Sequence, residues 1–225
     1  MADDRRRASS HVLLGDIGGQ MIALDDDVEH HLRRVLRLRD GDDVSVTDGA
    51  GSWRMSRVRL SGSTLSLEAV GEIVVEERSD RFTLATAIPK GDRVDWLVQK
   101  TVEIGVDRIV FVDAERSAVR WKPDRAVKQL TRLRRIADES TRQSRRVWRT
   151  EIDGPVPAAE LLGDAVIAEP GGAPVRGDEP LVAIGPEGGW TESELALSPR
   201  RVGLGSNILR VETAAVAVAT LRVLL

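Results

Sequence analysis

Two glycine-bearing turns near the end of the chain have the residue types best suited to hold a ligand. They read Ile184-Gly185-Pro186-Glu187-Gly188-Gly189-Trp190 and Leu204-Gly205-Ser206-Asn207-Ile208-Leu209-Arg210-Val211-Glu212-Thr213-Ala214. Each turn follows a short apolar run and leads into an expected helix. Because glycine has no Cβ, it permits φ > 0 and lets a ligand approach the bare main chain. The pair predicts a pocket built from main-chain groups, although a glycine-rich turn is a weak signal by itself.

Several common enzyme signatures are absent from the sequence. There is no GxxxxGK[ST] phosphate loop, and no GxGxxG follows the strands expected at Phe82–Ala87 and Arg108–Val112. The run Gly203-Leu204-Gly205-Ser206 is not a GxSxG nucleophile elbow. The chain has no cysteine and only three histidines, which are His11, His30 and His31. A cysteine nucleophile is thus excluded, and no metal site is expected.

Composition indicates an ordinary globular protein. The 225 residues are enough for one or two domains, and 41% of them are hydrophobic and 31% charged. No apolar run approaches the roughly 20 residues that cross a bilayer, and Met1–Arg7 lacks the apolar core of a secretory signal. The absence of cysteine fits a reducing compartment. We therefore expect a cytoplasmic protein with no membrane partner.

One segment carries a strong local charge. Between Arg116 and Arg149 there are twelve basic and three acidic residues, a net charge of +9 in a chain whose total is −3. A charge run is usually a solvated helix face. An excess of this size equally favours a surface that binds nucleic-acid phosphates.

The chain is expected to divide near residue 75. The first part is rich in turns, with strands predicted at Val44–Thr47, Trp53–Leu60 and Thr64–Val70, and these short strands suggest a small barrel. One helix is expected at Val28–Leu36, with Leu32, Val35 and Leu36 on one face.

The second part alternates strands and helices, which is typical of a parallel α/β sheet. Strands are expected at Phe82–Ala87, Arg108–Val112, Val166–Ala168 and Leu181–Ile184, and helices after Asp92, at Pro123, after Thr191 and at Val211–Leu225. Ligands of such sheets bind beyond the carboxyl ends of the strands. The first glycine turn lies at one of these ends.

These turns, together with motifs spread over nearly the whole chain, resemble the RsmE family of ribosomal RNA methyltransferases in the SPOUT (α/β-knot) superfamily. The matching motifs are His30-His31-Leu32, Val35-Leu36-Arg37-Leu38, Lys90-Gly91-Asp92, Gln99-Lys100, Glu103-Ile104-Gly105-Val106, Glu115-Arg116-Ser117, Gln143-Ser144-Arg145, Ile184 to Gly189, and Leu209-Arg210 with Glu212-Thr213-Ala214.

The resemblance implies a fold and a reaction. The fold is a PUA-like RNA-binding β-barrel over residues 1–75 and a SPOUT trefoil-knot methyltransferase domain with a parallel sheet over residues 76–225. The reaction is transfer of a methyl group from S-adenosyl-L-methionine to N3 of a specific uridine in 16S rRNA. The implied partners are small-subunit rRNA, in the assembled 30S subunit, and a second copy of the chain in a homodimer.

The same resemblance implies which residues bind the cofactor. They come from the two turns and from the end of a neighbouring strand, and they are Glu169, Ile184, Gly185, Pro186, Glu187, Gly188, Gly189, Leu204, Gly205, Ile208 and Leu209. Plain core packing is a compatible role for Leu204, Ile208 and Leu209, and for Trp190 it is the preferred role.

Arg210 and Glu212 are the expected catalytic residues. N3 of uridine must lose its proton, and a cation such as Arg210 could stabilise the charge that develops on the base. An ion pair with Glu212 at the helix start is an equally good role for Arg210. Glu212 or Glu187 could accept the proton or could only satisfy helix N–H groups.

RNA contacts are expected from two sets of basic residues, one in the barrel and one in the basic segment. They are Arg33, Arg34, Arg37, Arg116, Arg132, Arg135, Arg142 and Arg145. Two other functions stay open from the sequence. One is a SPOUT methyltransferase with a different RNA target, and the other is a non-catalytic RNA-binding factor in ribosome assembly.

Overall fold

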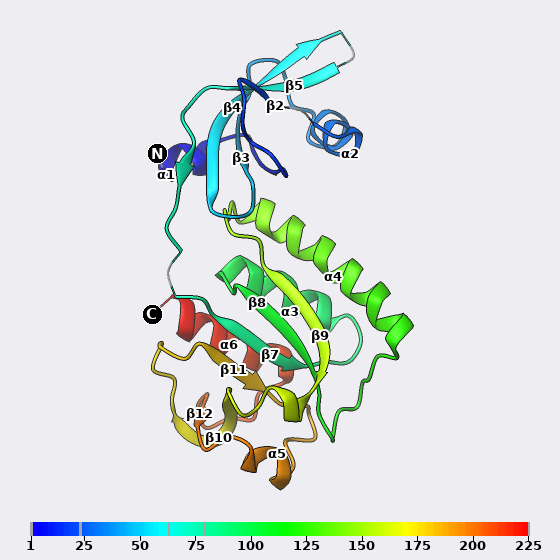
Figure 1. Cartoon of the computed structure of the whole chain (residues 1–225), viewed down its shortest axis with the longest axis vertical. Helices are drawn as coiled ribbons and strands as arrows, with labels where there is room; N and C mark the ends of the chain where they lie inside the picture. The colour runs from blue at the N-terminus through cyan, green and yellow to red at the C-terminus, as the bar shows by residue number, and fades with distance from the viewer. Residues whose placement is uncertain (1, 23, 63, 79, 225) are drawn as a thin grey trace. The chain divides into compact units, whose positions relative to one another are not determined.

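The computed structural model describes residues 2–22, 24–62, 64–78 and 80–224 (Figure 1). Contacts divide the chain into a first unit, residues 1–78 with 141–149, and a second unit, residues 79–140 with 150–225. The sequence did not lead us to expect that residues 141–149 return to the first unit. The boundary near residue 75 stays a prediction.

The first unit contains a mostly antiparallel sheet. In chain order its strands are β1 (Ser10–Leu13), β2 (Met21–Ile22), β3 (Asp43–Thr47), β4 (Ser52–Ser61), β5 (Thr64–Ala69) and β6 (Val74–Val75). They pair in the order β1-β3-β4-β5-β2, with β6 also on β4, and only β1 and β3 run parallel. Alternate residues such as Val44 and Val46, or Leu65 and Leu67, are buried in the core of this unit because successive side chains point to opposite faces.

Two short helical segments take the place of the single helix expected at Val28–Leu36. They are α2 (Asp26–His30), which Asp25 caps, and the π-helical turn η1 (His31–Val35); a further short helix, α1 (Ala2–Arg7), opens the chain. Leu32 is buried as expected, but Val35 and Leu36 are 61% and 42% exposed, so the prediction for these two residues was wrong. A π-helical turn has more residues per turn than an α-helix, and the 3.6-residue pattern therefore fails beyond His31.

Residues 141–149 are held in the first unit by polar contacts. Arg145 donates to the carbonyl oxygens of Arg5 and Ala8 at 2.5 and 2.6 Å, at the C-terminal end of α1, where a cation is favourable. The buried ring of His11 lies 2.7 Å from the Ser45 hydroxyl and 3.1 Å from the Arg146 carbonyl oxygen. Burial lowers the pKa of His11 from 6.5 to about 4.

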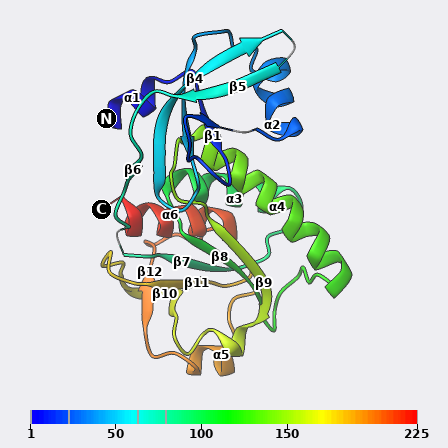
Figure 2. The same ribbon diagram turned by 45° about the horizontal axis from the view of Figure 1, so that its top comes forward.

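The second unit is built on a six-stranded parallel sheet (Figures 1 and 2). Its strands are β7 (Thr83–Ala87), β8 (Arg108–Asp113), β9 (Glu151–Pro157), β10 (Val166–Pro174), β11 (Leu181–Ile184) and β12 (Arg201–Gly203). They lie in the order β12-β10-β11-β7-β8-β9. The expected alternation is confirmed, although β9 and β12 were not predicted. Strand β9 contains Gly154 and Pro155, which are unfavourable in strands, and β12 is too short to give a recognisable pattern.

Helices cover the sheet of the second unit. They are α3 (Arg93–Ile104), α4 (Pro123–Gln143), the 3₁₀ turn η2 (Ala158–Glu160), α5 (Glu192–Ala196) and α6 (Val211–Val223). Helices α3, α4 and α6 share one core with Leu84 and Val182 of the sheet, and α6 packs against α3, β7 and β11 (Figure 2). Ala85 and Ala183, the next residues along the same strands, face the other core with Trp190.

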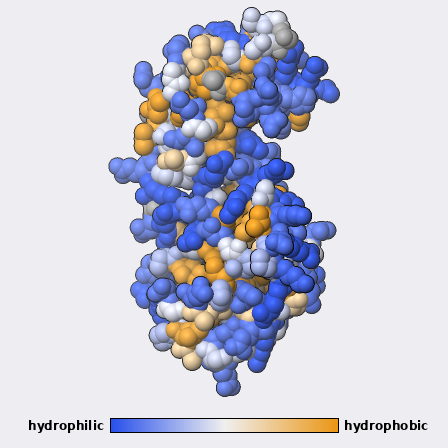
Figure 3. Space-filling model, turned by 45° about the vertical axis from the view of Figure 1, so that its right-hand side comes forward, coloured by the Kyte–Doolittle hydropathy of each residue, from blue (hydrophilic) through white to orange (hydrophobic). Residues whose placement is uncertain are grey.

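On the face that Figure 3 shows, apolar surface lies scattered among hydrophilic residues. Scattered exposure of this kind is normal in globular proteins. Within the described residues, no helix is both long enough and apolar enough to span a membrane.

Candidate functional site

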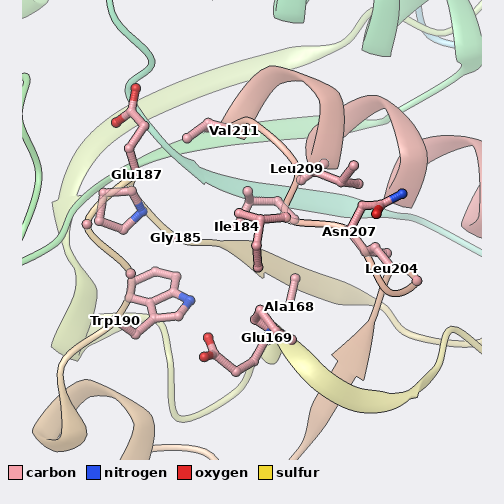
Figure 4. Close-up of a pocket in the computed structure, with 17 residues that line it drawn as sticks. Ala168, Glu169, Ile184, Gly185, Glu187, Trp190, Leu204, Asn207, Leu209 and Val211 are labelled. Carbon is pink, nitrogen blue, oxygen red and sulfur yellow. The ribbon is translucent and has the colours of Figure 1, made fainter.

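A pocket of about 320 Å³ opens at the carboxyl ends of β11 and β12, beside the middle of β10 (Figure 4). Ala168 to Pro170 of β10 form one wall, the turn after β11 forms a second, and the turn after β12 forms a third. The lining residues are Ala168, Glu169, Pro170, Ile184, Gly185, Pro186, Glu187, Gly188, Gly189, Trp190, Leu204, Gly205, Asn207, Ile208, Leu209, Val211 and Ala214. All eleven residues that we expected around a cofactor are therefore brought together.

Strand order explains why distant segments meet there. Strand β10 pairs with β11 on one side and with β12 on the other, and all three run parallel. Ala168 is level with Ile184, the last residue of β11, and with Val202 of β12. Strands β11 and β12 therefore end on either side of β10, whose pairing with β12 shifts register between Ala168 and Ala173, and the turns that follow them meet at this edge of the sheet.

The first turn packs closely against its own neighbours. A Cβ at Gly185 would lie 2.8 Å from Nε1 of Trp190, whose side chain is only 4% exposed. The Gly189 N–H donates to the Pro186 carbonyl at 2.8 Å and closes the turn. Arg116 borders it from outside, and a Cβ at Gly188 would lie 3.1 Å from the Arg116 Cβ. Glycine is required at Gly185 because a side chain there would collide with the indole.

The second turn is far more open. Gly205 has φ = 105°, which only glycine adopts easily, and a Cβ there would meet nothing within 4 Å. Asn207 is exposed and Ile208 is 81% exposed. Leu204 and Leu209 are half-buried and pack against the core beneath the pocket. The turn is thus anchored at both ends while its middle faces solvent.

The two expected catalytic residues lie next to the pocket but not in its lining. Arg210 is exposed between the lining residues Leu209 and Val211, and its carbonyl oxygen accepts from the Ala214 N–H at 2.8 Å to start α6. Glu212 is buried, its Oε1 lies 3.5 Å from Nε of Arg93, and its Oε2 has no hydrogen-bond partner. Across the described residues, the ion pair found at this helix start thus joins Glu212 to Arg93 and not to Arg210.

The eight arginines expected at an RNA surface have different environments. Arg34, Arg37 and Arg135 are exposed. Arg132, on α4, forms an ion pair with Asp95 of α3. Arg145 caps α1 as described above, and Arg33 and Arg142 are half-buried. Nη1 of Arg116 lies near two carbonyl oxygens of the first turn, at 3.4 Å from Gly188 and 3.2 Å from Trp190.

Some lining residues could not be identified from the sequence. Ala168, Asn207, Val211 and Ala214 carry no chemical signal, and only their position beside the expected residues could have suggested them. Trp190 belongs to the core, as preferred, but also lines the pocket, where its indole N–H has no hydrogen-bond partner. In the part of the chain that the structure describes, no three or more Asp, Glu or His residues cluster as metal ligands would.

Known protein families match both parts of this chain. Residues 76–222 match an RNA methyltransferase domain, and residues 24–64 match an RNA methyltransferase PUA domain. The chain is 32% identical over 220 residues to ribosomal RNA small subunit methyltransferase E of Synechocystis, covering 87% of this chain and 71% of that protein. It belongs to this methyltransferase E family.

Two further members support the assignment. The Bacillus subtilis methyltransferase E is 29% identical over 219 residues, covering 82% of each chain. The Neisseria gonorrhoeae methyltransferase E, in a crystal structure with bound S-adenosyl methionine, has a TM-score of 0.78 and 29% identity, covering 94% of this chain and 95% of that one. The expected family, SPOUT and PUA-like fold class and enzyme class are confirmed. The expected cofactor is the one that the Neisseria structure holds.

Proposed function

We propose that this chain transfers the methyl group of S-adenosyl-L-methionine to N3 of a specific uridine in 16S rRNA. Convergence of the two glycine turns on one pocket, in a chain of the methyltransferase E family, is the observation that carries the proposal. The methyltransfer chemistry resides in the cofactor, so the protein must bind it, orient it and favour the uridine anion.

The lining of the pocket fits such a cofactor. Ile184, Leu204 and Leu209 offer apolar walls for an adenine, and the glycine turns offer main-chain donors and acceptors for its edge. The carboxylate of Glu169 is half-buried in the wall formed by β10 and can accept hydrogen bonds from hydroxyl groups or attract a cation. When bound, S-adenosylmethionine supplies an electrophilic methyl group on a positively charged sulfur.

Arg210 is the residue that we assign to the uridine. N3 must lose its proton for the methyl group to be transferred, which places negative charge on N3, O2 and O4 of the base. That charge is lost as the N3–carbon bond forms and the carbon–sulfur bond breaks, which leaves a neutral thioether. An exposed guanidinium at the edge of the pocket can stabilise that charge. Glu212 supports Arg210 indirectly, because its pairing with Arg93 fixes the first turn of α6.

Replacement of Arg210 tests this role. Arg210→Ala should bind S-adenosylmethionine as the wild type does but lose turnover by about 100-fold, the scale for one charge-stabilising donor. Arg210→Lys should retain part of the activity because it keeps the charge. Calorimetry measures binding, and transfer of labelled methyl to small ribosomal subunits measures turnover. Unchanged turnover in Arg210→Ala would refute the role.

The modified base is identified in cells. Mass mapping of rRNA from a strain without this chain should show one uridine in 16S rRNA that has lost its N3 methyl group. Unchanged methylation of 16S rRNA, together with the loss of a methyl group from another RNA, would indicate a different target. No lost methyl group, and no binding of S-adenosylmethionine, would mean a non-catalytic RNA-binding role.

We also propose how the chain meets its partners. Exposed Arg34, Arg37 and Arg135 would contact rRNA phosphates of the assembled 30S subunit in the cytoplasm, which predicts binding that weakens steeply with salt. Two copies would act as a homodimer, in which the open second turn with its exposed Ile208 is covered by the other copy.

A further inference from the structure

The loop between β8 and α4 contacts the first glycine turn on the side away from the pocket. Arg116, in this loop, places Nη1 3.2 Å from the carbonyl oxygen of Trp190 and 3.4 Å from that of Gly188. Its aliphatic stem runs along the turn, since a Cβ at Gly188 would lie only 3.1 Å from the Cβ of Arg116. One side chain therefore both packs against the turn and donates to two of its carbonyl groups.

A second contact fastens the same loop just beyond the turn. Glu194 of α5 is 4% exposed, and its Oε1 accepts from the main-chain N–H of Glu115 at 2.8 Å. Its Oε2 accepts from the N–H of Thr191 at 2.8 Å. The residues from Gly188 to Thr191 are thus tied to the β8–α4 loop at both ends.

The turn needs such outside support. Gly188 and Gly189 have no side chains with which to pack, and glycine loses more conformational freedom than any other residue when it is fixed. Because a peptide group is planar, a hydrogen bond to its carbonyl oxygen fixes the whole group. Nη1 of a guanidinium carries two N–H groups, so this one atom can donate to two carbonyl groups that lie close together.

We propose that Arg116 is a positioning residue of the pocket, which holds the main chain from Gly188 to Trp190 in the shape that receives the methyl donor. This inference rests on the proposed function of the pocket as the S-adenosylmethionine site. It gives Arg116 a task inside the protein, although the charge of the segment from Arg116 to Arg149 had suggested RNA phosphate contact. Charged donors strengthen such hydrogen bonds, so the loss of the guanidinium should be measurable.

Arg116→Met tests the proposal because methionine keeps an unbranched apolar stem but removes the hydrogen-bond donors and the charge of the guanidinium. Calorimetry should show about tenfold weaker binding of S-adenosylmethionine, the scale of one charged hydrogen bond. Turnover at saturating cofactor should stay close to that of the wild type, so the effect falls on KM and not on kcat. Arg116→Lys should recover part of the affinity since it keeps a charged donor.

Arg125→Met is the matched control, because Arg125 is an exposed residue of the same basic segment and belongs to α4 rather than to the β8–α4 loop. It removes the same charge and should leave cofactor affinity at the wild-type value. Binding to small-subunit rRNA, measured at several salt concentrations, should change no more in Arg116→Met than in this control. Thermal unfolding of each variant shows whether the fold is kept.

Two outcomes would overturn the inference. One is cofactor affinity in Arg116→Met equal to that of the wild type, whether or not the RNA salt slope is reduced by about one phosphate contact. Affinity and thermal stability lost together, with no recovery in Arg116→Lys, would indicate only a general structural role. If the wild type binds no S-adenosylmethionine, the proposed function itself fails, and that result is seen before any variant is made.

Discussion

The two glycine turns share one pocket, but the molecule holds them very differently. In the first turn Gly185 contacts a buried indole, and Arg116 and Glu194 fasten the segment that follows. In the second turn the space around Gly205 is open and Ile208 is 81% exposed. Contacts within this chain therefore hold the wall of the pocket formed by the first turn, whereas the wall formed by the second turn is accessible.

A side chain at Gly185 should have the largest effect on cofactor binding. Gly185→Ala places a methyl group 2.8 Å from Nε1 of the buried Trp190, so the turn or the indole must shift. We expect a loss of about 1–3 kcal/mol in stability from overpacking and a fall of about 100-fold in cofactor affinity, measured by thermal unfolding and calorimetry. Gly163→Ala is the control, since its Cβ meets nothing within 4 Å. Wild-type affinity in Gly185→Ala would show that the first turn is as adaptable as the second.

Gly205→Ala should have a smaller effect because it adds strain without a collision. The backbone there has φ = 105°, which costs a residue with a Cβ about 1–3 kcal/mol. The open turn can relax to relieve part of this strain, so we expect about tenfold weaker cofactor binding in calorimetry. Ser206→Ala, at the exposed residue that follows Gly205, should bind the cofactor as the wild type does. A loss equal to that of Gly185→Ala would remove the difference between the turns.

Ile208→Ser should weaken the proposed dimer without destabilising the fold of each copy. A side chain that is 81% exposed contributes little to folding, so thermal unfolding should change by less than about 0.5 kcal/mol. If a second copy covers this turn, sedimentation should show self-association weakened by about tenfold. Val127→Ser, at another 66% exposed apolar residue, serves as the control. Unchanged self-association would mean that the other copy does not cover the second turn.

Mild acid should weaken the first unit and leave cofactor affinity unchanged. All three histidines lie in residues 1–78, and burial lowers the pKa of His11 to about 4. The unfolded chain takes up a proton near pH 6.5 while folded His11 stays neutral, so stability is full above pH 6.5 and falls toward pH 4. The slope is up to about 1.4 kcal/mol per pH unit.

Unfolding measured from pH 7 to pH 4.5 checks this prediction, with His11→Gln as the variant that should flatten the slope. Cofactor binding at pH 5.5 should equal that at pH 7 if the two turns are independent of His11. A parallel loss of affinity would show that the pocket depends on the first unit.

Much of the second unit could be predicted from local pattern. Gly105 after α3 and the capping box of Thr191 and Glu194 mark helix ends, because capping depends on residues close in sequence. Asp92 does precede α3, but its side chain makes no capping hydrogen bond. Strand β9 could not be found this way, since Gly154 and Pro155 break the pattern and its pairing with β8 stabilises it instead. In the first unit, the prediction that Val35 and Leu36 share a face with Leu32 also failed, because a π-helical turn changes which residues share a face.

The sequence by itself predicted an alternating α/β domain with one glycine turn at the carboxyl end of a strand, and its resemblance to a known family implied which eleven residues would lie around a cofactor. The first of these signals is local, because it depends on glycine and on strand-to-helix order. Only the tertiary structure decided which arginines are committed to internal contacts. Arg116 and Arg145 have the same charge as Arg125 and Arg135 in the sequence, yet they donate to carbonyl groups of the first turn and of α1. Charge can be counted along a chain, but a hydrogen bond between residues 74 or 140 positions apart exists only once the chain is folded.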